Sequence, residues 1–331
     1  YVHEGQSGGQ GDLGGVDLTY DVTENTELKA EVATSRKDAY GNEIKGDAYL
    51  AEVRHHSSKI DGTVYFREQG SGFGLGQQNG SEDSTRKIGL DAVYRFDSRF
   101  KIGGQAYRHY NLFTSAERDE AELNGFYMNG GYNLRAGLRS ATDRMGDGSL
   151  YRSTQLLGGV GYRMLDNRLH LRLDHDQSLD NNNENPAYPT RTVLGADYQI
   201  TSQTALFGEQ EFTYGTSQDT QGTRVGLKTM PWVGSQVGTS LERKYNENGQ
   251  RVLANLGLVQ TWQVNERWSV SAGLDRSQTL LKEEVPPFNT NVTSAVGALE
   301  DFTSVSLGTS YKQAYWSWAT RIETRQADTE K

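Results

Sequence analysis

The stretch Val16–Val32 reads VDLTYDVTENTELKAEV and decides the fold class. Apolar residues occupy every second position in each half of it, and charged or polar residues stand between them. Successive side chains of a strand point to opposite faces, so each half is a strand with one apolar face and one charged face. The tight turn Thr23-Glu24-Asn25 joins the halves into a hairpin.

The same hairpin unit recurs along the whole chain and gives about eighteen strands. Further tight turns are predicted at 57–59, 97–99, 166–168, 201–203, 231–234, 265–267 and 313–315. The connections between hairpins are mostly longer and rich in Gly, Asn, Asp, Ser and Thr: 36–46, 70–84, 111–120, 143–152, 179–190, 215–221, 246–250 and 280–300. This asymmetry is typical of outer-membrane barrels, whose short turns face the periplasm, and a soluble β-sandwich lacks it. We therefore predict an all-β, antiparallel, up-and-down transmembrane β-barrel.

The composition supports a barrel with a wet interior. Of 331 residues only 34% are hydrophobic, yet Phe, Trp and Tyr reach 10%, which is not the composition of a disordered chain. A barrel accounts for both values, because only the outward face of each strand needs to be apolar. Because the chain has no cysteine, a disulfide framework and a thiolate metal site are excluded. No apolar run approaches the ~18 residues of a transmembrane helix. The net charge of -9 argues against nucleic acid as a partner.

We interpret residues 1–12 as a glycine-rich lead-in and residues 13–331 as the barrel, located in the bacterial outer membrane. An outer-membrane protein needs a signal peptide, and none stands at Tyr1, so we expect a mature chain or part of a longer one. The strand count and the polar end of the chain lead us to expect that this segment belongs to a larger barrel or multidomain protein.

Aromatic residues gather at the predicted tight turns. Trp and Tyr prefer the level of the lipid headgroups, so this clustering predicts an interfacial girdle on the periplasmic side. The alternative is that aromatic residues favour strand ends in any β protein. The predicted interface residues are Phe96, Phe100, Tyr162, Tyr198, Trp232, Trp262, Trp268, Trp316 and Trp318.

The other strand face carries many charges, which must meet water or other charges because burying them unpaired is costly. A barrel of about eighteen strands is wide enough for an aqueous channel unless it is plugged. Arg135, Arg139 and Arg172 form either a basic ladder that favours anions or part of a mutually neutralising lining. The candidate lining residues are Arg54, Arg95, Arg135, Arg139, Arg172, Asp174, Arg321, Glu323 and Arg325.

Other chemistry has weaker support. Gly70–Gly76 lacks the following helix of a phosphate-binding loop, so we interpret it as an extracellular or in-folding loop. The stretch Asp180–Asn185 offers oxygen ligands but lacks the spacing of an EF-hand. His170 shares its face with Asp174, too far along the strand for a catalytic hydrogen bond. We predict neither an enzyme nor a cofactor nor a metal site.

The segments Arg67–Gly80 and Gln236–Trp262 carry a resemblance to a known family. From about residue 13 onward, the chain resembles the C-terminal barrel region of very large Gram-negative outer-membrane surface proteins that carry arrays of immunoglobulin-like repeat domains. The resemblance implies an outer-membrane location and a barrel, and it implies no catalytic residues.

Two functions follow. The first is a water-filled pore or translocation conduit for polar solutes or a polymer. The alternative is a membrane anchor for a large surface-exposed or adhesive region, with a closed lumen. A soluble β-solenoid or adhesin array is a third reading, which the tryptophans at the tight turns disfavour. Expected partners are outer-membrane lipid and lipopolysaccharide, further domains of the same polypeptide, or a periplasmic or secreted partner. The long connection 280–300, with Pro286-Pro287, is the candidate inward or partner-binding loop.

Overall fold

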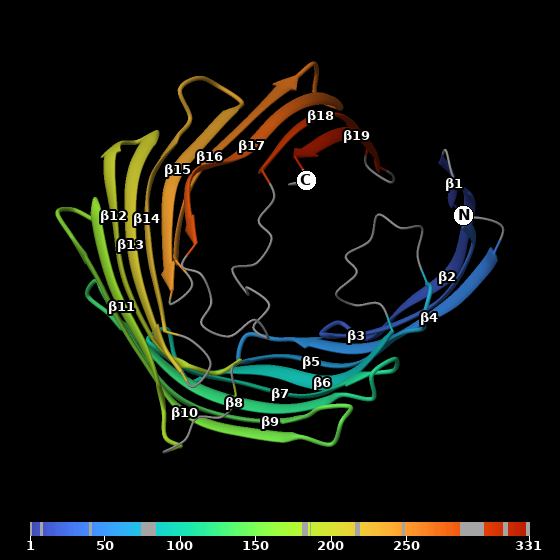
Figure 1. Cartoon of the computed structure of the whole chain (residues 1–331), viewed down its shortest axis with the longest axis horizontal. Coiled ribbons are helices and arrows are strands. Elements are labelled where there is room, and N and C mark those ends of the chain that lie inside the picture. The colour runs from blue at the N-terminus through green and yellow to red at the C-terminus, as the bar shows by residue number, and fades with distance from the viewer. Residues whose placement is uncertain are drawn as a thin grey trace. The chain divides into compact units, whose positions relative to one another are not determined.

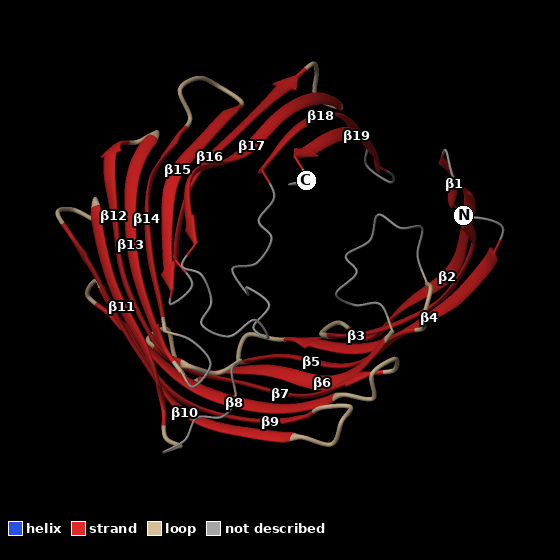
Figure 2. Cartoon of the chain, viewed as in Figure 1, coloured by secondary structure: helices blue, strands red, loops and turns tan. Residues whose placement is uncertain are grey.

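The computed structural model describes residues 2–6, 9–39, 42–73, 84–180, 185, 187–215, 219–246, 249–284, 301–313 and 317–328. These residues form β-strands joined by turns and loops (Figure 2). No helix among them is long and apolar enough to cross a membrane. The chain divides into two compact units, one made of Tyr1–Gly158 with Asp176–Pro189 and the other of Gly159–His175 with Thr190–Lys331.

Unit 1 contains nine whole strands, and each pairs antiparallel with the next along the chain. They lie side by side as a curved sheet (Figure 1). The strands are β1 (Val2–Gln6), β2 (Gly9–Thr23), β3 (Thr26–Ala39), β4 (Asn42–His56), β5 (Ile60–Gln69), β6 (Thr85–Arg95), β7 (Phe100–Asn111), β8 (Glu117–Asn129) and β9 (Tyr132–Arg144). Strands β10 (Leu150–Met164) and β11 (Leu169–Ser178) each contribute residues to both units.

Unit 2 is also a meander, in which each whole strand pairs antiparallel with the next. The strands are β12 (Thr190–Thr201), β13 (Thr204–Tyr214), β14 (Thr220–Thr229), β15 (Ser235–Asn246), β16 (Gly249–Gln263), β17 (Trp268–Glu284), β18 (Asp301–Lys312) and β19 (Ser317–Asp328). The predicted antiparallel, up-and-down order of about eighteen strands is therefore confirmed: among the described residues, β2–β19 are eighteen strands and β1 is a short nineteenth.

The two faces of the sheet have the polarity that the alternation predicts. On one face, large apolar side chains are open to the surroundings; Val16 is 77% exposed, Leu123 58% and Ile322 72%. On the other face, polar side chains such as Glu120 and Gln155 are buried. A water-soluble protein places its large apolar residues the other way round. We call these the apolar face and the polar face.

The structure corrects two predictions about loops. The segment 36–46 is not a long loop, because β3 continues to Ala39 and β4 begins at Asn42. Likewise β15 ends at Asn246 and β16 begins at Gly249. Charged residues such as Arg36, Glu43 and Lys45 interrupt the apolar–polar alternation by which strands are recognised in the sequence. Antiparallel pairing nevertheless continues beyond the region where one face must be apolar. The contrast between short and long connections is consequently less regular than predicted.

The glycine-rich segment 1–12, expected to precede the first strand, contributes to two strands. Residues 2–6 pair with residues 9–13 in antiparallel register. The predicted tight turns that lie within the described residues fall where expected and carry side-chain hydrogen bonds, whereas the turn 313–315 lies largely outside them. Asp97 accepts hydrogen bonds from the backbone N–H groups of Arg99 at 2.7 Å and Phe100 at 2.8 Å. In the turn between β16 and β17, Asn265 accepts hydrogen bonds from the backbone N–H groups of Arg267 and Trp268, both at 2.9 Å.

The apolar face predicts a depth-dependent response to charge. Leu138 lies at the middle of β9 and Leu134 lies near its tight-turn end, and both are exposed on the apolar face. If lipid covers this face, Leu138→Arg lowers the free energy of unfolding by about 2–4 kcal/mol and Leu134→Arg by about 0–1 kcal/mol. Denaturant unfolding in lipid vesicles measures both values. Equal small losses at the two positions contradict lipid contact.

The turn at Asp97 predicts a pH effect. The backbone N–H groups of Arg99 and Phe100 lower the pKa of Asp97 because they bind its charged form. The folded-state pKa lies below the unfolded one, so the stabilisation is present above about pH 4 and is lost as pH falls through the folded value. Asp97→Asn keeps the acceptor oxygen and removes this pH dependence. Nuclear magnetic resonance titration of Asp97 checks the shift, and a pKa at or above the ordinary value contradicts it.

Candidate functional site: the polar face and the loop segments on it

Most of the candidate lining residues form ion pairs on the polar face. In unit 1, Arg54 bonds Glu52 at 2.5 Å, Arg95 bonds Asp61, Arg135 bonds Asp176 at 3.1 Å, and Arg139 bonds Glu122 at 2.6 Å. In unit 2, Arg172 pairs with Glu209, Arg321 pairs with Glu323 at 2.9 Å, and the Arg325 guanidinium lies 4.2 Å from the centre of the Phe302 ring. Asp174 lies on β11, two residues beyond Arg172 and on the same face.

These pairs bear on the proposed basic ladder. Arg139 also donates a hydrogen bond to the side-chain carbonyl of Gln155 at 3.0 Å, so its guanidinium is held on two sides. Arg135, Arg139 and Arg172 each have a carboxylate partner. The arrangement therefore favours the neutralising lining over a ladder of free positive charge.

A segment of the connection between β11 and β12 lies against the polar face of unit 1. Asn185 and Tyr188 belong to this connection, yet they are only 1% and 7% exposed. The Tyr188 hydroxyl donates a hydrogen bond to the carboxylate of Glu120 on β8. The same carboxylate accepts hydrogen bonds from Tyr107 at 2.8 Å and from Gln105 at 3.1 Å, both on β7.

Two further side chains fasten this segment. Asn185 donates to the carboxylate of Asp143 at 3.1 Å, and Arg118 binds the same carboxylate with two nitrogens at 2.7 Å each. The amide of Gln155, itself 2% exposed, donates to the backbone carbonyls of Tyr188 at 3.1 Å and Pro189 at 2.9 Å. We call residues 185 and 187–189 the latch segment.

The electrostatics of the latch segment are consistent with Tyr188 acting as a donor. Burial raises the pKa of Tyr188, and the hydrogen bond to the Glu120 carboxylate raises it further. The phenol therefore stays protonated, as the hydrogen bond requires. The guanidinium of Arg118 also lies 5.1 Å from the centre of the Tyr188 ring, a favourable cation–π arrangement.

A second loop segment, Gly70–Phe73, also packs on the polar face of unit 1. The backbone N–H of Gly70 donates to the carbonyl of Asp47 at 2.8 Å. A side chain at Gly46 on β4 would come within 2.2 Å of the backbone nitrogen of Phe73, so only glycine permits this approach. The in-folding reading of Gly70–Gly76 thus holds for its described part, residues 70–73. The predicted inward loop 280–300 falls largely outside the described residues.

The predicted interface aromatics lie at the tight-turn ends of their strands. In unit 1, the rings of Phe96 and Phe100 stack with their centres 5.0 Å apart. In unit 2, the Trp268 ring lies 4.9 Å from that of Tyr311 and 6.1 Å from that of Trp318. Tyr162, Tyr198, Trp232 and Trp262 also lie beside such turns, whereas Trp316 lies outside the described residues. The Arg168 guanidinium lies 5.6 Å from the centre of the Tyr198 ring, and the indole N–H of Trp232 donates to the side-chain carbonyl of Gln260. Their role at a membrane interface stays a prediction.

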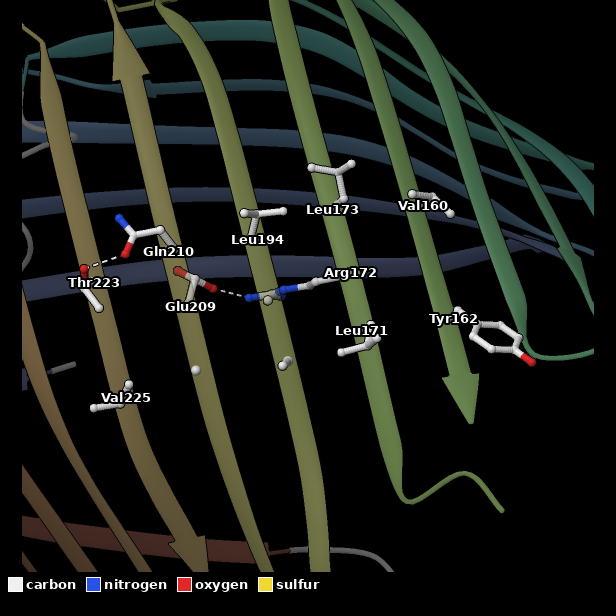
Figure 3. Close-up of a pocket in the computed structure, with 13 residues that line it drawn as sticks. Val160, Tyr162, Leu171, Arg172, Leu173, Leu194, Glu209, Gln210, Thr223 and Val225 are labelled. Carbon is white, nitrogen blue, oxygen red and sulfur yellow. Dashed lines mark hydrogen bonds and ion pairs between the residues drawn. The ribbon is translucent and has the colours of Figure 1, made fainter. Parts of the chain in front are cut away.

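A groove of about 610 Å³ crosses the apolar face of unit 2 (Figure 3). Leu171, Leu173, Leu194 and Val225 line it, together with the small residues Ala196 and Gly208. On the polar side of the same strands, Arg172 of β11 crosses Gly195 of β12 to reach Glu209 of β13 (Figure 3). A Cβ atom at Gly195 would lie 2.3 Å from the Arg172 Nε atom.

The Nδ1 atom of His170, on β11, lies 3.9 Å from Oδ2 of Asp197 on the neighbouring strand β12. No group of three or more His, Cys, Asp and Glu side chains is placed to hold a metal ion in the part of the chain that the structure describes.

Sequence reasoning missed the residues of the latch segment and their partners. Glu120, Asp143 and Gln155 occupy strand positions that alternate with the apolar ones, so the sequence alone places them on the polar face. An aromatic residue, Tyr188, between two prolines in an otherwise polar connection was a second signal.

The comparisons with known proteins show the fold. No protein-family model and no curated protein matches the chain. Among solved structures, the chain is similar to the copper transporter OprC at 11% identity and TM-score 0.53, with 92% of this chain and 64% of that one covered. It is similar to the siderophore receptor PirA from Pseudomonas aeruginosa at 10% identity and TM-score 0.59, with 98% and 69% covered.

A third similar structure is the ferric-catecholate import receptor Fiu from E. coli K12, at 9% identity and TM-score 0.58, with 95% of this chain and 68% of that one covered. The fold is that of a Gram-negative outer-membrane β-barrel. This agrees with the fold class and the location predicted from the sequence. The chain spans less than two-thirds of the length of OprC. None of these structures tests the resemblance to surface proteins with immunoglobulin-like repeats, which stays a prediction.

The crossing of Arg172 over Gly195 predicts an energetic coupling. Gly195→Ala forces the Arg172 side chain away from Glu209, whereas an Arg172→Ala background removes the three atoms that the added methyl group would approach most closely. We expect a coupling free energy of about 1 kcal/mol between the two substitutions. A double-mutant cycle of unfolding free energies measures it. Additive effects show that Arg172 does not cross Gly195.

Proposed function

We propose that the chain forms the barrel of an outer-membrane channel through which polar solutes or a polar polymer cross in water. The observation that carries this proposal is the charged, ion-paired polar face opposite the exposed apolar face. A sheet with these two faces has stable surroundings only if lipid covers one face and water reaches the other. The similar structures named as a copper transporter, a siderophore receptor and an import receptor support the same class of function.

The proposed partners follow from the same two faces. Outer-membrane lipid and lipopolysaccharide cover the apolar face, and the aromatic residues at the tight turns lie at the headgroup level. Further domains of the same polypeptide, or a periplasmic or secreted partner, complete the assembly in which the barrel works. Nucleic acid is not among the partners we propose.

A second candidate is a membrane anchor for a surface-exposed or adhesive region, as the resemblance implies. One observation favours it: two loop segments, Gly70–Phe73 and the latch segment, lie on the polar face and occupy space that a channel needs. In this reading the paired charges and the loops close the lumen.

Planar bilayer recordings of the refolded protein separate the two candidates. A channel gives discrete, stable current steps. A protein that inserts with β-sheet circular dichroism yet carries no current contradicts the channel and supports the anchor.

The ion pair between Arg139 and Glu122 predicts how selectivity changes. Glu122→Gln leaves the Arg139 charge without its carboxylate, so anion permeability rises relative to cation permeability. Arg139→Gln leaves Glu122 alone, so the ratio moves the other way. Reversal potentials in a salt gradient measure both shifts. Ser140→Gln, on the apolar face of the same strand, is the control and leaves the ratio unchanged. Shifts of the same sign in both lining variants contradict the proposal.

A further inference from the structure

Basic side chains stand directly opposite one another on the polar face of unit 1. Arg67 of β5 is opposite Lys87 of β6, and Lys87 is opposite His109 of β7. By contrast, Arg139 on the same face stands opposite a carboxylate, that of Glu122. Like charges at directly opposite positions destabilise a sheet. An anion that binds between Arg67 and Lys87 offsets this repulsion.

Lys87 is held by aromatic rings. Its ammonium group lies 4.0 Å from the centre of the Tyr107 ring and 5.8 Å from that of the Tyr65 ring, and no carboxylate among the described residues forms an ion pair with it. A Cβ atom at Gly89 would lie 2.7 Å from the Tyr65 hydroxyl oxygen and 2.8 Å from the Tyr107 Cβ atom. Glycine at this position therefore lets the two tyrosines come together beneath Lys87. A ring face attracts the ammonium but supplies no counter-charge.

Arg67 has only a share in one carboxylate. Glu52 binds Arg67 at 2.6 Å and also binds Arg54 at 2.5 Å, so one negative charge serves two guanidinium groups. The Glu52 side chain is 1% exposed, whereas that of Arg67 is 51% exposed. The Arg67 guanidinium therefore stays accessible from the space over the polar face, and Glu52 does not.

The carboxylate of Glu120, close to Tyr107, is satisfied by other groups. It accepts hydrogen bonds from the neutral side chains of Tyr107, Gln105 and Tyr188. These donors fix its position away from Lys87. The positive charge of Lys87 is therefore left for a group that comes from outside the sheet.

We infer that Arg67 and Lys87 form a binding site for an oxyanion, the phosphate or carboxylate group of a dissolved molecule. A guanidinium binds two oxygens of such a group at once, and an ammonium adds a compact charge beside it. The inference rests on the proposed function and deepens it, because it names anionic molecules as the class of polar solute that the polar face binds. Tyr65 and Tyr107 are positioning residues for Lys87.

Isothermal titration calorimetry of the refolded protein at low ionic strength tests the inference. Inorganic pyrophosphate and citrate are the probes, and they separate a phosphate ligand from a carboxylate ligand. Saturable binding of at least one probe is expected in the wild type. Lys87→Gln and Arg67→Gln are each expected to raise its Kd by about tenfold or more, because each removes a charged hydrogen-bond donor.

Arg86→Gln is the matched control. Arg86 is adjacent to Lys87 in the sequence but lies on the apolar face, where it pairs with Glu68 at 2.6 Å. The substitution changes the net charge of the protein by the same amount, and the Kd of the probe is expected to stay as in the wild type. Circular dichroism confirms that all variants keep their β-sheet.

The outcomes separate the site from the channel. A protein that conducts in planar bilayers but binds neither probe saturably overturns the anion site and leaves the channel in place. Equal weakening in Arg86→Gln and Lys87→Gln also overturns the site, because the overall charge then attracts the anions. A protein that binds a probe as expected but inserts without current supports the site and overturns the channel.

Discussion

The two-residue period of a β-strand is the constraint on which everything else in this structure depends. Every strand offers alternate side chains to opposite faces, so a sheet with an apolar face exposed must collect its charges on the other. The backbone leaves no other arrangement, because its N–H and C=O groups are already committed to neighbouring strands. Ion pairs such as Arg139–Glu122 are the consequence: charges confined to one face approach one another closely and pair.

This constraint also explains which parts of the fold the sequence predicts. Alternation through Val16–Val32 is strong because both strands have a strictly apolar parity, and the structure keeps that parity. Alternation fails near Arg36 and Lys45, where both faces are polar, so the strand ends were assigned to a loop. The high glycine content of residues 2–6 and 9–12 predicts a segment outside the strands, yet these residues pair in antiparallel register. Antiparallel pairing needs only backbone groups, so glycine is compatible with it.

The site was less predictable, for a geometric reason. Parity places Arg172 and Glu209 on one face, but their contact spans an intervening strand and depends on the missing side chain at Gly195. Tyr188 and Glu120 are separated by 68 residues, and no periodic signal relates a loop residue to a strand. The composition of the strands predicts which residues share a face, whereas register and loop path determine which of them meet.

The contacts of the latch segment show what the burial of polar groups on the polar face requires. Asn185 and Gln155 are both buried, and each buried polar group needs its partners to offset the loss of water. Here the partners are present, from Asp143 to the carbonyl of Pro189, so the segment is held against a face that otherwise meets water.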